Sequence, residues 1–353
     1  MAFNAINFHG ERHSYVRAKS MNFTVMFTSA GRRVELVRAF RRAFSSLRIQ
    51  GRIIAIDTDP LAPALRCADR GVVVPCVSSS GYVQAVVDLC RTEHVNVIFP
   101  LIDPDIPVLA ENRLVIEETG AQVAVVSPES AGIVRDKWRT CEFFENIGLK
   151  TPRSWLPEDL DENELRYPLF IKPRKGSGGA NCFRIETLDE LRFFCRYVPD
   201  ALIQEFIRGS EITTDVACTL DSEVVAVVSR KRIEVRGGEV SKGVTIKNLS
   251  LQKACVRIAR ALPARGPITV QCIMKDGIPY FTEINARFGG GVPLGIAAGA
   301  DSPRWLLARI AGIPDLIPPL GTYTEGLYCS RYDDSFFLTE SDHEALESSR
   351  LRS

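Results

Sequence analysis

The pattern of apolar residues changes once along this 353-residue chain, and that change constrains the fold more than any other feature. Before the change, short apolar runs alternate with segments whose apolar residues recur at helical spacing. The expected strands cover residues 23–27, 52–56, 72–74, 95–99 and 122–126. The expected helices between them include residues 34–47 and 82–91. Alternation of this kind predicts an α/β domain with a parallel, doubly wound sheet.

Beyond about residue 148 the strand-like runs follow one another as in antiparallel hairpins. These runs cover residues 169–172, 182–186, 202–207, 211–220, 224–234, 268–274 and 278–284. Lys275-Asp276-Gly277 separates the last two and is a hairpin turn signal. Thr187 with Glu190 is typical of a helix start, and residues 136–147 and 250–262 also fit helices. This part of the chain is therefore predicted to be α+β.

Composition argues against several classes of protein. A formal net charge of +1 gives no bulk field that would attract nucleic acid or an anionic membrane. No apolar run approaches the ~20 residues that a membrane-spanning helix needs. The ten cysteines are scattered without a CxxC pair, which favours mostly buried thiols in a reducing cytoplasm. Residues 1–20 are polar and fit a loose extension, so Met21 could be the natural start.

A glycine-rich segment follows the expected strand that ends at Lys172. It reads Pro-Arg-Lys and then Gly176, Ser177, Gly178 and Gly179. Glycines allow backbone N–H groups to approach phosphate oxygens closely, and a lysine adds a point charge. A plain flexible hairpin is the alternative, because the segment is neither a Walker loop nor a GxGxxG turn that opens a helix.

Two further stretches suit the remaining parts of a nucleotide. The apolar run at residues 201–207 ends in polar residues and is followed by Glu211, so it offers an apolar slot and a carboxylate for ribose hydroxyls. An amphipathic strand with solvated glutamates is the alternative. Lys137 opens a helix after Asp136, and on its own it reads as a surface lysine.

The most specific pattern is Glu283-x-Asn285-x-Arg287, which runs directly into three glycines. Residues two apart on a strand face the same side, and Mg²⁺ takes oxygen ligands. Glu283 and Asn285 are therefore candidate metal ligands, with Gln271 on the partner strand. Arg287 could stabilise the charge of a transferred phosphoryl group. The alternative is the polar outer face of a hairpin.

In combination, these residues resemble the ATP-grasp superfamily, and in particular the short, single-copy relatives of the carbamoyl-phosphate synthase large subunit. The resemblance covers about residues 21–312 and implies ATP and one or two Mg²⁺ ions, for which Mn²⁺ could substitute. It implies that Lys137 and Lys172 contact phosphates under the loop of residues 176–179. It implies further that Gln204, Glu205, Phe206 and Ile207 hold adenine, that Glu211 binds ribose, that Gln271, Glu283 and Asn285 bind the metal, and that Arg287 meets the γ-phosphate.

The resemblance also implies an order of domains. Residues 1–20 are the extension, 21–127 a Rossmann-like preATP-grasp domain, 128–204 the small ATP-grasp lobe with connecting helices, 205–330 the large lobe and 331–353 a peripheral tail. The chain departs from the family where Gly179 is followed by Ala180 and Asn181, and it has no second homologous half. Two-step carbamoyl phosphate synthesis therefore does not follow from the resemblance.

The leading hypothesis is a carboxylate–amine ligase. ATP would phosphorylate a carboxylate, an amine would displace phosphate, and Arg287 and Lys172 would be the catalytic residues. Two alternatives stay open, namely carbamoyl phosphate-type chemistry on bicarbonate or carbamate and a non-catalytic ATP-binding protein. The expected partners are a small-molecule carboxylate and amine, and a homodimer is open because relatives are often dimers.

Substrate contacts are expected from both parts of the chain. One group of candidates for anionic substrate groups lies between residues 230 and 290, and it comprises Arg230, Arg232, Lys242, Gly289 and Gly290. The other follows two expected strands of the N-terminal sheet and comprises Arg32, Arg33, Asp103 and Asp105. Ligands bind beyond the carboxyl ends of strands in such sheets. A solvated basic hairpin is the alternative for the first group.

Overall fold

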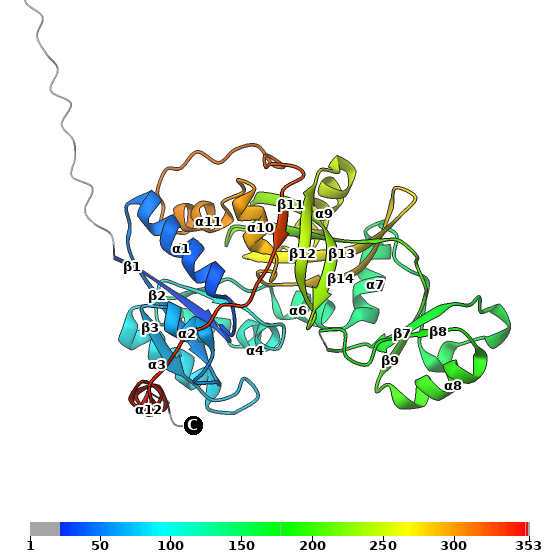
Figure 1. Cartoon of the computed structure of the whole chain (residues 1–353), viewed down its shortest axis with the longest axis horizontal. Helices are drawn as coiled ribbons and strands as arrows, with labels where there is room; N and C mark the ends of the chain where they lie inside the picture. The colour runs from blue at the N-terminus through cyan, green and yellow to red at the C-terminus, as the bar shows by residue number, and fades with distance from the viewer. Residues whose placement is uncertain (1–21, 177, 350, 352–353) are drawn as a thin grey trace, which may run out of the picture.

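The computed structural model describes residues 22–176, 178–349 and 351. The predicted N-terminal extension, Met21 and Ser177 lie outside these residues. Figure 1 shows the N-terminal domain at one end of the molecule, a four-stranded sheet at the other end, and a six-stranded sheet between them. Within the described residues, no helix is long and apolar enough to cross a membrane.

The N-terminal domain has a five-stranded sheet in the order β3-β2-β1-β4-β5, and every pair in it is parallel. Its strands are β1 (Asn22–Thr28), β2 (Gln50–Asp57), β3 (Arg70–Val73), β4 (Val97–Pro100) and β5 (Gln122–Val123). Its helices are α1 (Val34–Leu47), α2 (Pro63–Cys67), α3 (Tyr82–Glu93), α4 (Asp105–Glu111) and α5 (Arg113–Glu117). The predicted parallel, doubly wound sheet is confirmed.

Helices cover both faces of this sheet because successive side chains of a strand point to opposite faces. On β1, Val25 and Phe27 belong to the cluster that contains Phe40 of α1. Met26, between them, belongs to the cluster that contains Val86 of α3. The continuous apolar run of β1 is therefore explained by burial on both sides.

Two helices, α6 (Pro128–Arg135) and α7 (Lys137–Asn146), lead to the four-stranded antiparallel sheet. Its order is β6-β9-β7-β8. Its strands are β6 (Ser154–Trp155), β7 (Leu169–Pro173), β8 (Phe183–Ile185) and β9 (Ala201–Glu205), and short 3₁₀ turns occupy Pro157–Asp159 and Glu162–Glu164. Helix α8 (Leu188–Tyr197) starts as predicted, since the Thr187 hydroxyl accepts a hydrogen bond from the Glu190 N–H at 3.3 Å.

The six-stranded sheet is antiparallel with the order β14-β13-β10-β11-β12-β15. Its strands are β10 (Ser210–Cys218), β11 (Val224–Arg236), β12 (Glu239–Ile246), β13 (Pro267–Lys275), β14 (Ile278–Asn285) and β15 (Tyr328–Ser330). Helix α9 (Leu249–Ala261) packs on one face, and α10 (Val292–Ala297) and α11 (Ser302–Ile310) pack on the other. The predicted β13–β14 turn is present, with positive φ at Asp276 and Gly277.

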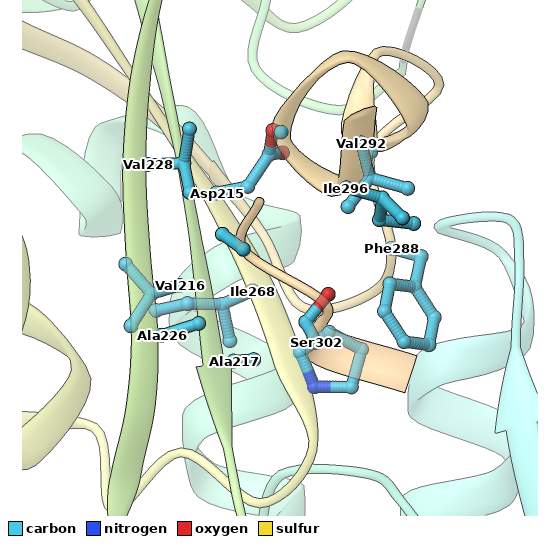
Figure 2. Close-up of a pocket in the computed structure, with 14 residues that line it drawn as sticks. Asp215, Val216, Ala217, Ala226, Val228, Ile268, Phe288, Val292, Ile296 and Ser302 are labelled. Carbon is cyan, nitrogen blue, oxygen red and sulfur yellow. The ribbon is translucent and has the colours of Figure 1, made fainter. Parts of the chain in front are cut away.

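Between this second face and α10–α11 lies a void of about 10 Å³ (Figure 2). Val216, Phe288 and Ser302 are among the residues that line it. At that size it has room for about one water molecule, so it is a packing defect and not a ligand site.

Phe288 joins the two halves of the molecule. Its ring lies 5.9 Å from that of Phe40 on α1 and 5.5 Å from that of Phe99 on β4, centroid to centroid. The residue after Arg287 is therefore buried in the aromatic core of the N-terminal domain.

The C-terminal segment returns to the N-terminal domain after β15 (Figure 1). Within the predicted peripheral tail, helix α12 (Glu340–Ser348) lies against β3, and the Leu351 N–H donates to the Val73 carbonyl at 3.1 Å. All ten cysteines are free thiols. Five of them are buried, four are partly buried and one is exposed, so the prediction that most are buried is not met.

Candidate active site

A cleft of about 760 Å³ lies between the four-stranded and six-stranded sheets. Of the residues predicted to bind nucleotide or metal, all those that are described line it. They are Lys137, Lys172, Gly176, Gly178, Gly179, Gln204, Glu205, Phe206, Ile207, Glu211, Gln271, Glu283, Asn285 and Arg287. The fold therefore brings together residues that are up to 150 positions apart, from Lys137 to Arg287.

Lys172 near the end of β7 is the most buried cation of the cleft. Its side chain is only 7% exposed, and its ammonium makes no hydrogen bond or ion pair within the described residues. Burial lowers the pKa of Lys172, although the charge of Glu283 opposes the shift. A buried charge without a partner is unfavourable, so an anion that enters the cleft is stabilised here.

The start of the glycine-rich loop is attached to the first turn of α7. Arg174 forms two hydrogen bonds with the carboxylate of Asp136, at 3.1 and 2.6 Å. Lys137 donates from its ammonium to the Gly176 carbonyl at 2.7 Å. Gly178 and Gly179 then have φ values of +75° and +74°, which favour glycine. Sequence reasoning missed the Asp136–Arg174 pair, because both residues read as ordinary surface charges.

The wall at the end of β9 combines apolar and cationic groups. The side-chain amide of Gln204 on β9 donates to the Ser154 hydroxyl on β6 at 2.8 Å. This hydrogen bond links the two strands. Arg184 lies over the ring of Phe206 at 4.7 Å and lines the cleft, although no motif in the sequence points to it. Strand pairing of β9 stops at Glu205, so the backbone of residues 206–208 lies outside both sheets.

The predicted metal ligands lie beside one another on β13 and β14, where Gln271 is the register partner of Glu283. They comprise one carboxylate and two amides. Within the described residues, no group of three or more His, Cys, Asp and Glu side chains could hold a metal by itself. Mg²⁺ is commonly held by one or two carboxylates together with substrate phosphates. This donor set fits Mg²⁺ that arrives with a nucleotide.

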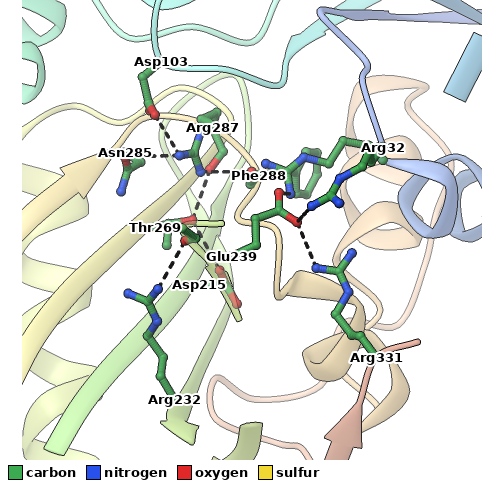
Figure 3. A network of polar contacts seen from close by, with 12 residues as sticks. Arg32, Asp103, Asp215, Arg232, Glu239, Thr269, Asn285, Arg287, Phe288 and Arg331 are labelled. Atoms are coloured by element: carbon green, nitrogen blue, oxygen red, sulfur yellow. Dashed lines mark hydrogen bonds and ion pairs between the residues drawn. The ribbon is translucent and has the colours of Figure 1, made fainter. Parts of the chain in front are cut away.

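Arg287 links the metal set to the N-terminal domain (Figure 3). Its Nη2 donates to the Asp103 carboxylate at 2.8 Å and to the Asn285 amide oxygen at 3.2 Å, and Nη1 donates to the Phe288 carbonyl at 3.3 Å. Its Nε is buried and has no hydrogen-bond partner. These three hydrogen bonds fix the orientation of the guanidinium.

A second cavity of about 200 Å³ opens next to the cleft. The two share Gly178, Arg232, Gly238, Gln271 and Arg287, so they are continuous. The turn between β11 and β12 touches the glycine-rich loop here: a Cβ added at Gly238 would lie 2.7 Å from the Gly178 Cα.

The predicted substrate residues of the six-stranded sheet divide between this cavity and the outer surface. Arg230, Gly289 and Gly290 line the cavity, and Arg232 lines it as well as the cleft. Arg230 is already paired with buried Asp215, with Nε–Oδ2 at 2.9 Å. Lys242 lines neither space, because it forms an exposed ion pair with Glu234 at 2.7 Å.

Of the predicted substrate residues in the N-terminal domain, Arg33 and Asp103 line the second cavity. Arg32 does not, because its side chain is 64% exposed. Asp105 is fully buried and accepts hydrogen bonds from the hydroxyls of Thr28 at 2.6 Å and Ser29 at 3.0 Å. Of the four predicted residues, the structure therefore places Arg33 and Asp103 at the cavity and Arg32 outside it, and Asp105 supports the loop that carries Asp103.

Comparison with known proteins agrees with this geometry. Residues 25–124 match the model of the PylC-like N-terminal domain, and residues 134–291 match the model of the ATP-grasp domain. Residues 134–291 of the chain are thus an ATP-grasp domain. More particularly, its ATP-grasp domain follows a PylC-like N-terminal domain.

Among curated proteins, the chain is 30% identical over 131 residues to a carbamoyl-phosphate synthase of Methanobrevibacter smithii, which covers 35% of this chain and 36% of that protein. The chain thus spans about a third of the length of that relative. Among solved structures, one similar fold is the biotin carboxylase domain of 2-oxoglutarate carboxylase from Hydrogenobacter thermophilus, in complex with MgADP and bicarbonate. It superposes with a TM-score of 0.68 at 19% identity, over 87% of this chain and 73% of that one. An L-amino acid ligase from Bacillus licheniformis gives a TM-score of 0.63 at 20% identity, over 82% and 74%. These structures confirm the predicted fold.

Proposed function

We propose that this protein is an ATP-dependent carboxylate–amine ligase that works through an acyl phosphate. The observation that carries the proposal is the position of Arg287, which lies where the nucleotide-sized cleft meets the second cavity and next to Glu283 and Asn285. A group held in the second cavity would thus face the end of a triphosphate held in the cleft.

In the first step, a carboxylate oxygen of the acceptor attacks the γ-phosphorus of ATP. The bond from that phosphorus to the β,γ-bridging oxygen breaks, and ADP leaves. Arg287 and Lys172 stabilise the negative charge on the transferred phosphoryl group by binding it with donors that are already in place. Glu283, Asn285 and Gln271 would hold Mg²⁺, which when bound neutralises phosphate charge.

In the second step, an amine nitrogen attacks the acyl carbon. The carbon–oxygen bond to phosphate breaks, phosphate leaves, and the nitrogen loses a proton to solvent. The products are an amide, ADP and phosphate. Arg287, which lines both the cleft and the second cavity, stays close to the phosphate in this step. The L-amino acid ligase among the similar structures supports this class of reaction, although that likeness concerns the fold alone.

The test is ADP release by the full chain with Mg-ATP and pooled amines and carboxylates, with and without bicarbonate. We expect release in at least one carboxylate–amine pool and its loss in Glu283→Gln. Glu223→Gln, an exposed glutamate between β10 and β11, is the matched control. Release with bicarbonate alone would favour the carbamoyl phosphate-type alternative. Tight nucleotide binding without release in any pool would favour a non-catalytic protein.

A further inference from the structure

The second cavity carries a charge imbalance at the end that lies away from the nucleotide cleft. Three arginines surround one carboxylate there: Glu239 is 2.9 Å from Arg33, 3.0 Å from Arg331 and 3.7 Å from Arg32, measured between charged atoms. None of these four residues lines the nucleotide cleft. A bound triphosphate would therefore not neutralise this excess positive charge.

Arg33 and Glu239 are the members of this group that line the cavity, and Arg32 and Arg331 lie outside it. The Arg33 side chain is 15% exposed, and its only partner among the described residues is Glu239. Its buried Nη1 is the atom that contacts the Glu239 carboxylate at 2.9 Å. Glu239 is shared with Arg331 and Arg32, so it does not balance the charge of Arg33 alone. Arg33 is thus a fixed cation on the cavity wall.

The Arg33 side chain packs against Gly290, in the glycine segment that follows Arg287. A Cβ added at Gly290 would lie 2.4 Å from the Arg33 Nη1 and 2.9 Å from the Glu239 Oε1, so the guanidinium rests against the glycine. Gly290 is three residues beyond Arg287. The cavity wall therefore carries guanidinium groups at two separate points, Arg287 beside the metal set and Arg33 beside Gly290.

We propose that the acceptor is a small dianionic molecule: its reacting carboxylate is held near Arg287, and a second anionic group is held by Arg33. This proposal rests on the proposed function, because it assigns the substrate class of the same site. Asp103 pairs with Arg287, and Glu239 pairs with Arg331 and Arg32 as well as with Arg33, so neither leaves a free negative charge that would exclude such a ligand. At about 200 Å³, the cavity suits a molecule of roughly amino-acid size.

Calorimetric titration of the full chain tests this assignment. The protein is first saturated with Mg²⁺ and a non-hydrolysable ATP analogue, and nucleotide affinity is recorded separately. The probes are α,ω-dicarboxylates of four to six carbons, their mono-amides, and carboxylates of matched length that end in a phosphonate. Each mono-amide differs from its parent in one charge. The phosphonate series shows whether the second group is recognised as a carboxylate or as a phosphate-like anion.

We expect at least one dianion to bind about tenfold or more tightly than its mono-amide, which corresponds to ~1.4 kcal/mol. Arg33→Gln should abolish that difference, and Arg33→Lys should restore part of it. Arg38→Gln, which removes an equal charge from an exposed position of α1, should leave it unchanged. Nucleotide affinity should stay within about twofold in all three variants, which also verifies folding.

Equal binding of dianions and mono-amides, a dianion preference that survives Arg33→Gln, or no binding of any probe to nucleotide-loaded protein would overturn the assignment. Failure of the nucleotide itself to bind would instead overturn the proposed function. The two failures are therefore distinguishable.

Discussion

Arg287, two residues beyond the end of β14, donates a hydrogen bond at 2.8 Å to Asp103, a residue 184 positions earlier in the N-terminal domain. The two side chains are 14% and 31% exposed. A half-buried ion pair of this kind fixes a guanidinium in one orientation. The N-terminal domain thus positions a group that we assign to phosphoryl transfer.

Asp103→Asn should lower turnover more than nucleotide affinity. The amide cannot balance the charge of Arg287, so the guanidinium loses its orientation in the transition state. We expect kcat to fall by at least about tenfold, or ~1.4 kcal/mol, while the Kd for nucleotide stays within about threefold. Glu118→Gln, at an exposed position of the same domain, is the control. An unchanged kcat would show that Asp103 does not position Arg287.

Lys172→Met should weaken nucleotide binding and at the same time raise the stability of the nucleotide-free protein. The variant loses a phosphate contact, so nucleotide Kd should rise by at least about tenfold. It also removes a buried charge that has no partner, so without nucleotide the free energy of unfolding should rise by about 1 kcal/mol. Urea unfolding with and without Mg-nucleotide measures both effects, with Lys150→Met at an exposed position as the control. A loss of stability in the absence of nucleotide would contradict this account of Lys172.

Gly237 and Gly238 provide a matched pair of alanine substitutions. Both have positive φ, at +57° and +77°, so each substitution has a similar backbone penalty of about 1 kcal/mol. Only a Cβ at Gly238 would collide with Gly178 of the loop, since a Cβ at Gly237 meets nothing within 4 Å. Gly238→Ala should therefore weaken nucleotide binding severalfold in a fluorescence titration, whereas Gly237→Ala should not. Equal effects would show that the contact is unimportant.

Stability should depend on pH through Asp105. Burial raises the pKa of Asp105 from 3.8 to about 6, although the Thr28 and Ser29 hydroxyls oppose the shift. The folded state therefore holds this proton more tightly than the unfolded state does, and the free energy of unfolding decreases as pH rises from about 4 to 6.

Asp105→Asn lacks this titration. Relative to wild type, it should gain about 2 kcal/mol of stability between pH 4.5 and 7.5. Urea unfolding of both proteins across that range provides the measurement. Parallel pH profiles would show that Asp105 does not titrate in this window.

The parallel sheet was predictable because burial on both faces makes β1 a continuous apolar run in the sequence. Strand β12 was not, because Gly243 and charged residues such as Glu239 and Lys242 interrupt its pattern. Its pairing with β11 and β15, rather than its own composition, makes it a strand. Helix α12 was also missed, although Thr339 and Asp342 form a capping box that the sequence displays.

The residues that line the nucleotide cleft could be predicted from the sequence because they occur in short motifs. The second cavity could not, because its contacts join distant segments. Adjacent Arg32 and Arg33 look equivalent in the sequence, but in the folded chain, after the turn at Gly31 with φ of +47°, the Arg32 side chain is largely exposed and the Arg33 side chain is largely buried beside Glu239. The ion pair between Asp103 and Arg287 likewise depends on how the domains pack. The spacing of residues within either segment does not predict it.

The burial of Phe288 among Phe40 and Phe99 limits how this protein can be recombined with its relatives. A chimera that takes its N-terminal domain from one parent and the rest from another must match the aromatic packing on both sides of that contact. A mismatch would displace the peptide next to Arg287, so recombinants could fold and yet be inactive. We therefore expect the two domains to be inherited together in evolution.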